Sequence, residues 1–438
     1  MNIGLDNDGI QAGRILIAPF LFVSLAHREG ADHFRVYRQI FPRNHIFMNR
    51  NTCVPHPVGR GNTDFRAVTA HANNFNLIRL IAASQVFYNH SAGHLKLPRL
   101  DDLPLIGEIC LYVIAGLPGV PIFFVISGFL VTQSYLTGNG GTASYFWRRS
   151  LRIFPALWTH YVVILAALAA TGAWQLEQLL NPKMWSWIAG AFLIGSDWWG
   201  NIVSGHRPFD WGGFYQRFPS GVLWTINVEI GFYLLVPIVF APIWRKLRLN
   251  MAVFLIFAAA SYWFALRVTA MESAGVHGNI MGFMRNQPAA YFWTFLLGGV
   301  AALYWSRVRF AFEKRFFLWA AAYILVTLID IQMFGIAYIK LTKLESLTVL
   351  RMMLLAGMVL SFAHSLPALG RPFRGFDLSY AIYLYHMLVV WTFYNLGFKE
   401  SAWAWPPLIA IVITISAVSW FLIEKPAMHL RNWRSTPK

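Results

Sequence analysis

Two polar side chains interrupt an apolar stretch early in the chain. Residues 73–93 read NNFNLIRLIAASQVFYNHSAG, in which Arg79 and His90 are eleven positions apart. At about 100° per residue, eleven steps return to within about 20° of the same helical face, roughly 16 Å further along the axis. A guanidinium can bind an anion and an imidazole can take up a proton near neutral pH. The simpler alternatives are an arginine that extends to a polar interface and a hydrogen-bonded structural histidine.

A second cluster is basic. Residues 145–155 read YFWRRSLRIFP, and Arg149 and Arg152 share one helical face because they are three positions apart. Paired guanidinium groups at the start of a helix can hold a phosphate in bidentate geometry. The alternative is an ordinary basic anchor at a membrane surface. The preceding run, PIFFVISGF, places Ser127 beside Gly128, a pair that is also typical of close helix packing.

Two further polar residues lie in apolar runs. Glu229 is part of LWTINVEIGFYLL, where a carboxylate needs a partner. Two partners are open: His90, which the carboxylate could orient, or an arginine in a purely structural pair. His386 ends the run SYAIYLYH and completes the set of polar residues inside apolar segments.

Aromatic side chains gather in one loop, residues 197–221, which contains Trp198, Trp199 and Trp211 among glycines and polar residues. Flat aromatic rings with interspersed polar groups suit the apolar faces and hydroxyls of a sugar. The alternative is an aromatic belt at a membrane interface, where Trp and Tyr are enriched.

Composition decides the environment of these residues. Of the 438 residues 57% are hydrophobic and only 13% charged, and the mean hydropathy is +0.48. These values exclude ordinary soluble domains and indicate a polytopic membrane protein. The net charge of +17 does not indicate nucleic-acid binding, because Lys and Arg lie in short clusters between apolar runs. Cys53 and Cys110 have no spacing typical of a disulfide framework or a metal site.

Apolar runs predict an all-α transmembrane bundle of about ten spans. A shorter run, residues 184–196, is predicted to be re-entrant or interfacial because about 13 residues are too few to cross a bilayer. The predicted spans are residues 75–92, 109–137, 154–174, 222–243, 251–269, 289–305, 316–330, 347–366, 379–395 and 405–424.

The distribution of basic residues predicts the topology. With ten spans, the segments on one side carry 16 Lys and Arg in 43 residues, whereas the loops on the other side carry 9 in 109. The positive-inside rule therefore places the basic segments and both termini in the cytoplasm. Residues 1–72 are predicted to be a poorly ordered cytoplasmic extension, or partly an artefact of an upstream translation start. Residues 73–426 form the predicted membrane domain, and residues 427–438 a cytoplasmic tail.

Taken together, these stretches resemble the acyltransferase 3 family of integral membrane O-acyltransferases, which acylate surface and secreted polysaccharides and related glycans. The resemblance extends over about residues 73–426, and the motifs occur in the family's order. The motifs are the Arg79 to His90 spacing, FFVISGF at 123–129, the RxxR of Arg149 and Arg152, LWTxxVEI at 223–230, YLYH at 383–386 and EKP at 424–426.

The resemblance implies an enzyme that transfers an acyl group, expected to be acetyl, from cytoplasmic acyl-CoA to a glycan hydroxyl. The expected location is the bacterial inner membrane, with the lipid bilayer and polysaccharide biosynthesis proteins as partners, and no permanently bound cofactor or metal is expected. His90 would be the general base and Glu229 would assist it. The other expected site residues are Arg79, Ser127, Arg149 and Arg152 for the donor, and Trp198, Trp199, Trp211 and His386 for the acceptor.

Two other classes of function are compatible with the same residues. A proton-coupled transporter or flippase would use the intramembrane set as a proton relay. A lipid-facing scaffold would use none of the residues catalytically. The members of the relay would be Arg79, His90, Glu229 and His386.

Overall fold

The structure is a computed structural model. It describes residues 73–97, 117–138, 140–196, 213–335, 347–366, 369–373 and 375–430, together with the single positions Trp199, Phe209, Leu341 and Leu344. The predicted extension, residues 1–72, and residues 431–438 of the predicted tail lie outside the described residues.

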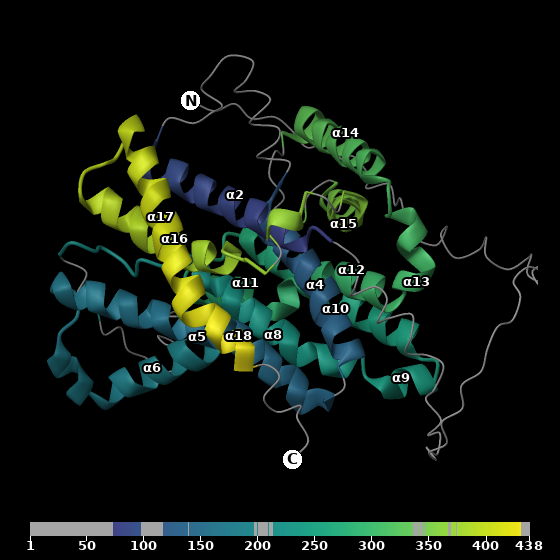
Figure 1. Ribbon diagram of the computed structural model, residues 1–438, viewed down its shortest axis with the longest axis horizontal. Helices are drawn as coiled ribbons and strands as arrows, with labels where there is room; N and C mark the ends of the chain where they lie inside the picture. The colour runs from purple at the N-terminus through teal and green to yellow at the C-terminus, as the bar shows by residue number, and fades with distance from the viewer. Residues whose placement is uncertain are drawn as a thin grey trace, which may run out of the picture. The chain divides into compact units, whose positions relative to one another are not determined.

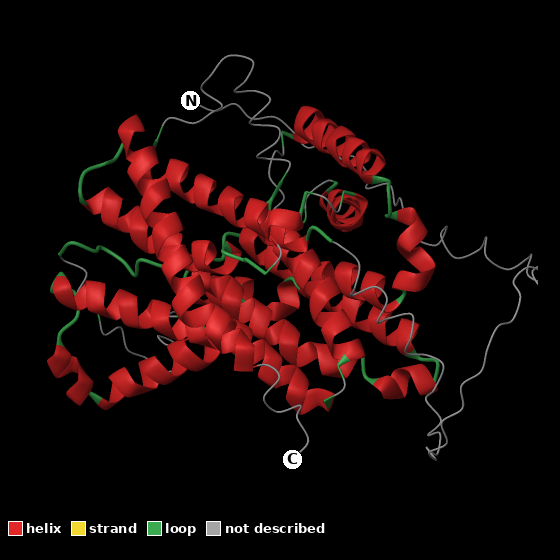
Figure 2. Cartoon of the chain, in the orientation of Figure 1, coloured by secondary structure: helices red, strands yellow, loops and turns green. Residues whose placement is uncertain are grey.

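Helices and short helical turns make up the secondary structure of the described residues, which contain no strand (Figure 2). The predicted all-α class is therefore confirmed for this part of the chain. The helices before residue 250 are α2 (Phe75–Leu95), α4 (Gly119–Thr137), α5 (Gly141–Ala170), α6 (Pro182–Ile194), α8 (Trp224–Val239) and α9 (Pro242–Lys246). The later helices are α10 (Asn250–Ser273), α11 (Asn279–Arg285), α12 (Phe292–Leu303), α13 (Trp305–Val308), α14 (Phe316–Phe334), α15 (Thr348–Ser365), α16 (Ser379–Asn395), α17 (Trp405–Ser419) and α18 (Lys425–His429).

Seven helical segments are long and apolar enough to cross a membrane. The predicted spans at α2, α12 and α16 are not among them: α2 contains several polar residues, and α12 and α16 are only 12 and 17 residues long. The chain is thus a multi-pass membrane protein, while the count of ten spans and the orientation of the termini remain predictions. The seven segments are Gly119–Thr137, Gly141–Ala170, Gly221–Lys246, Asn250–Ser273, Phe316–Phe334, Thr348–Ser365 and Ala402–His429.

The short helix α6 begins and ends as its sequence dictates. The side chain of Asn181 accepts a hydrogen bond from the backbone N–H of Lys183 at 3.0 Å, and Pro182 occupies the first turn, where its missing N–H costs nothing. The helix ends at Gly195, whose φ of 84° suits glycine best. The result is a 13-residue helix, which matches the short segment predicted here.

Helices α4 and α12 pack with their backbones in close contact. A Cβ atom on Gly128 would lie 2.0 Å from the carbonyl oxygen of Phe295, and one on Gly298 would lie 2.1 Å from that of Val125. Each helix therefore needs a glycine at the point where the other backbone approaches. This contact fixes α4, which contributes Ser127 to the candidate site.

Helix α2 lies beside α16 and also contacts α4 (Figure 1). The residue before it, Asn74, is fully buried, and its side-chain amide donates to the carbonyls of Phe362 and Leu366 at 3.0 and 2.7 Å. Those carbonyls belong to the end of α15, where backbone acceptors lack helical partners. The contact anchors the start of α2 and so fixes the depth of Arg79.

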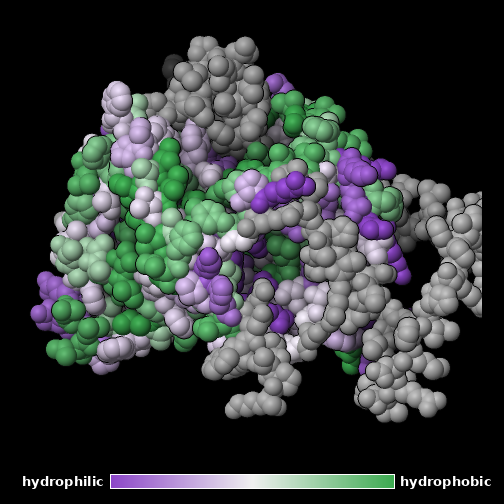
Figure 3. Space-filling view, in the orientation of Figure 1, coloured by the Kyte–Doolittle hydropathy of each residue, from purple (hydrophilic) through white to green (hydrophobic). Residues whose placement is uncertain are grey.

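The outer surface carries many apolar side chains, as expected for helices that face lipid. Figure 3 shows apolar side chains over much of the face on which α14 and α17 lie. Phe317 of α14 is 76% exposed, and Leu422, just after α17, is 72% exposed. Exposed apolar side chains of this kind are typical of a surface that faces lipid rather than of the surface of a soluble protein.

Candidate active site

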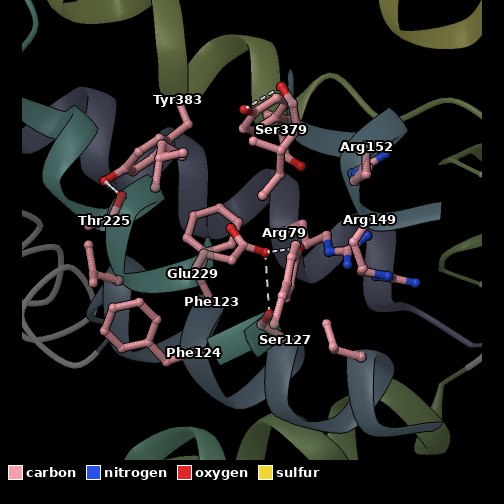
Figure 4. Close-up of a pocket in the computed structure, with 16 residues that line it drawn as sticks. Arg79, Phe123, Phe124, Ser127, Arg149, Arg152, Thr225, Glu229, Ser379 and Tyr383 are labelled. Carbon is pink, nitrogen blue, oxygen red and sulfur yellow. Dashed lines mark hydrogen bonds between the residues drawn. The ribbon is translucent and has the colours of Figure 1, made fainter. Parts of the chain in front are cut away.

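A cavity of about 70 Å³ is lined by side chains of α2, α4, α5, α8 and α16. Figure 4 shows Arg149 and Arg152 on one side of it and the hydrogen-bonded pair Thr225 and Tyr383 on the opposite side, with Glu229 between them. Five predicted site residues from four separate helices therefore meet at one cavity. These residues are Arg79, Ser127, Arg149, Arg152 and Glu229.

A carboxylate that the sequence analysis did not single out joins two of the arginines. Arg152 Nη2 donates to Asp377 Oδ2 at 2.5 Å, and Arg79 Nη1 lies 3.4 Å from the same oxygen. The Asp377 side chain is only 5% exposed, whereas the side chains of Arg79 and Arg152 keep 20% and 21% exposure. Asp377 thus holds the two guanidinium groups together while leaving part of each accessible to another anion.

The position of Asp377 explains why it stays ionised. Burial raises the pKa of this carboxyl, but the guanidinium groups of Arg152 and Arg79 and hydrogen bonds from Ser379 outweigh burial, so the pKa falls from 3.8 to about 2. Its Oδ1 accepts from the backbone N–H of Ser379 at 3.2 Å and from the Ser379 hydroxyl. A polar pair directly before an apolar run is a helix-start signal. Applied to Asp377 and Ser379, that signal could have found this residue.

The third arginine is positioned differently. Arg149 Nη2 donates to Ser134 Oγ at 3.0 Å, and its guanidinium carbon lies 5.8 Å from the centroid of the Tyr233 ring. Its Nε is buried and has no hydrogen-bond partner among the described residues. A buried N–H group without an acceptor destabilises the folded protein, and a bound ligand that accepts a hydrogen bond from it would remove this cost.

Glu229 contacts neither His90 nor an arginine through a hydrogen bond or ion pair within the described residues. Its Oε1 accepts from Tyr233 at 2.5 Å, one turn further along α8, and from Ser127 at 3.3 Å. The interpretation that Glu229 orients His90 is therefore not supported. The physical reason is depth: Glu229 lines the cavity with Arg79, and His90 lies about 16 Å further along α2.

The two predicted histidines form a second group. His90 Nδ1 lies 2.9 Å from His386 Nε2. His386 was predicted to contact the glycan acceptor, but its side chain is fully buried by protein. Tyr383 connects the two groups, because it lines the cavity and its ring centroid lies 6.0 Å from that of His386. Cavity and histidine pair are thus neighbours along α16.

Of the tryptophans predicted to bind the acceptor, the structure describes Trp199, which joins neither group. Trp199 packs edge to face against Phe283 of α11, with ring centroids 5.3 Å apart. Trp198 and Trp211 lie outside the described residues. Within the part of the chain that the structure describes, no group of three or more His, Cys, Asp and Glu side chains could hold a metal ion.

Comparison with known proteins assigns the chain to a family. The acyltransferase 3 family, described as an acyltransferase domain, matches residues 73–424. This range begins two residues before α2 and ends at Glu424, just after α17. It therefore contains every residue of the cavity and of the histidine pair.

Individual relatives agree with this assignment. The chain is 38% identical over 367 residues to Nodulation protein 10 of Rhizobium leguminosarum bv. viciae, which covers 83% of this chain and 95% of the relative. It is 33% identical over 156 residues to O-acetyltransferase OatA of Staphylococcus aureus and 28% identical over 163 residues to Putative peptidoglycan O-acetyltransferase YrhL of Bacillus subtilis, each match covering about a third of this chain and 24% of the relative. No solved structure matches. The chain belongs to the acyltransferase 3 family of membrane acyltransferases.

Proposed function

We propose that this enzyme transfers an acetyl group from cytoplasmic acyl-CoA to a hydroxyl of a cell-surface or secreted glycan, in the bacterial inner membrane. The observation that carries the proposal is the convergence of Arg79, Arg149 and Arg152 on one cavity. Two relatives are named O-acetyltransferases, and one of these names includes peptidoglycan, which is a glycan polymer.

Charge supports an anionic donor. Three guanidinium groups line the cavity together with the carboxylate of Glu229. Asp377 pairs with Arg79 and Arg152, and the buried carboxylate of Glu424 also acts on Arg152. Acyl-CoA is polyphosphorylated, and guanidinium groups bind phosphate in bidentate geometry. The cavity of about 70 Å³ is far smaller than the roughly 300 Å³ or more of sites that enclose a whole ligand. It fits one phosphate-sized group, so the rest of the donor lies outside it.

His90 is the proposed general base. It removes the proton from the acceptor hydroxyl, whose oxygen attacks the thioester carbonyl of the donor. The carbon–sulfur bond breaks, and the CoA thiolate leaves with the proton that His90 has taken up. The roughly 16 Å between Arg79 and His90 along α2 is a distance that the extended pantetheine arm of the donor can bridge.

The experiment compares purified wild-type protein with His90→Ala in proteoliposomes that contain acetyl-CoA and the polysaccharide of the source cell. Mass spectrometry of the polysaccharide reports acetylation, and a thiol assay reports release of free CoA. We expect His90→Ala to lose both signals and His277→Ala, an exposed histidine in a loop, to keep them. Equal acetylation by wild type and His90→Ala would contradict the proposal. Substrate flux without any acyl donor would instead indicate the transporter or flippase.

A further inference from the structure

The two histidines meet edge to edge. His90 on α2 and His386 on α16 have nearly parallel rings, with an angle of 9° between the planes and 5.2 Å between the centroids. Stacked rings with overlapping faces would be closer. The separation instead matches the N···N distance of 2.9 Å plus the two ring radii. A hydrogen bond in the plane of both rings joins the two nitrogens, which is the direction that a ring lone pair requires.

The other nitrogen of His386 determines where the protons are. His386 Nδ1 lies 3.0 Å from the carbonyl oxygen of Ile382, one turn earlier on α16. A carbonyl oxygen only accepts hydrogen bonds, so Nδ1 must carry the proton. A neutral imidazole has one N–H, and therefore His386 Nε2 is an acceptor. Among the described residues, the donor that faces it is His90 Nδ1–H.

The surroundings keep His386 neutral. The ring is fully buried, and an isolated charge without a partner is costly there. Besides Tyr383, whose ring centroid lies 6.0 Å from that of His386, the titratable groups that interact with the pair are His94 on α2 and His160 on α5, and beyond His94 lies Arg217. All three are basic, so none of them would stabilise a second positive charge.

We infer that His386 is a positioning residue that fixes the tautomer of His90. With its Nδ1 proton donated to His386 Nε2, His90 keeps the lone pair on Nε2, and this nitrogen is the one left to act as base. The inference rests on the proposed function. It replaces the predicted role of His386 in binding the acceptor, for which a fully buried ring is unsuited. The logic is that of a base oriented by a third group, here the Ile382 carbonyl acting through His386.

The proton balance follows from this arrangement. The acceptor hydroxyl gives its proton to His90 Nε2 as its oxygen bonds to the acyl carbon, and His90 becomes an imidazolium whose Nδ1–H still donates to His386. When the carbon–sulfur bond breaks, the CoA sulfur takes the proton from Nε2. His386 never changes its protonation state, and the pair returns to its starting tautomers.

The test measures the tautomer directly. ¹⁵N NMR of histidine-labelled protein in lipid nanodiscs distinguishes Nδ1–H from Nε2–H, and the His90 signals are assigned by their loss in His90→Ala. We expect wild-type His90 to be protonated at Nδ1. In His386→Gln the side-chain carbonyl can still accept from that nitrogen, so the tautomer should persist. In His386→Leu no acceptor remains, and Nε2–H should appear.

Activity provides the second readout. We expect His386→Leu to lower kcat by about 10² to 10⁴, as for a base held in the wrong tautomer, with the KM for acetyl-CoA unchanged. His386→Gln should recover most of that loss. Wild-type His90 protonated at Nε2, or equal losses in His386→Leu and His386→Gln, would overturn the inference. Because the NMR measurement needs no turnover, it stands apart from the proposed function, which is contradicted if His90→Ala acetylates as wild type does or if substrate moves across the membrane without any acyl donor.

Discussion

The arginine cavity and the histidine pair share two helices, α2 and α16, yet they are built on opposite principles. At the cavity, Asp377 pairs with Arg79 and Arg152 and keeps permanent charge in place. At the pair, the rings of His90 and His386 satisfy each other as neutral groups. A site for a polyanion needs fixed charge, whereas a base needs a free lone pair. The difference explains why the two tasks are separated along α2.

The largest expected effects are on the kinetic constants: loss of the histidine should change kcat, and loss of a cavity arginine should change the KM for acetyl-CoA. His90→Ala should lower kcat by about 10² to 10⁴ and leave the KM for acetyl-CoA unchanged, because it removes only the proton acceptor. Arg149→Ala should raise that KM about 10- to 100-fold, since a hydrogen bond to a charged group contributes about 1.5–3 kcal/mol. Steady-state kinetics with varied acetyl-CoA measures both. If both variants changed the same parameter, the two regions would not have separate tasks.

Removing the carboxylate of the cavity should cost stability. Asp377→Asn leaves Arg79 and Arg152 without their anion, and breaking a buried pair of this kind costs about 3 kcal/mol or somewhat less, because a fifth of each arginine is exposed. Thermal unfolding of the detergent-solubilised protein measures the loss. Glu400→Gln is the control, since this carboxylate is 62% exposed and its loss should cost at most about 0.5 kcal/mol. Equal melting temperatures for the two variants would mean that Asp377 does not hold the arginines.

A milder substitution of Arg149 separates the effect of its planar guanidinium group from the effect of its positive charge. Arg149→Lys keeps the positive charge but loses the planar fork, so the KM for acetyl-CoA should rise about 3- to 10-fold. Arg148→Lys provides the matched control, because Arg148 Nη1 donates to Ser144 Oγ at 2.6 Å and Arg148 does not line the cavity. A KM that rises equally in both variants would point to general surface charge instead of a specific phosphate contact.

The smallest expected effect is on pH dependence. The pKa of Asp377 is lowered from 3.8 to about 2, so its contribution to stability is fully present above pH 3.8 and is lost only as pH falls through about 2. Between pH 5 and pH 8 the stability difference between wild type and Asp377→Asn should therefore stay constant. Melting temperatures of both proteins at several pH values test this. A difference that shrinks toward pH 5 would show that the arginines do not keep the carboxylate ionised.

Sequence patterns predicted part of this arrangement well. Periodicity placed Arg79 on the helix that the structure confirms, and the three-residue spacing correctly put Arg149 and Arg152 on one side of α5. What could not be predicted are contacts between distant segments. Asp377 lies 298 positions from Arg79, and His386 lies 296 positions from His90. Helical periodicity carries no information about such pairs, because it describes one helix at a time.

For Glu229, the sequence indicated that a partner is needed but did not identify which residue it is. Its apolar surroundings correctly indicated that it needs a partner, but the choice between His90 and an arginine left out the actual ones. Tyr233 is one turn away on the same helix and Ser127 is on α4. The first follows from an i, i+4 spacing that could have been considered, and the second depends on the glycine contact between α4 and α12 that fixes the position of α4.

The bridge between Arg79 and Asp377 also constrains how the protein is made. Arg79 leaves the ribosome 298 residues before its carboxylate. At about 5–20 residues per second, that interval is on the order of 15 to 60 s. During this time an arginine that costs about 2.5–3.5 kcal/mol at the centre of an inserted helix has no anionic partner from residue 377. Helix α2 can settle at its final depth only when the segment before α16 has been made, so insertion and assembly of this enzyme are coupled across 298 of its 438 residues.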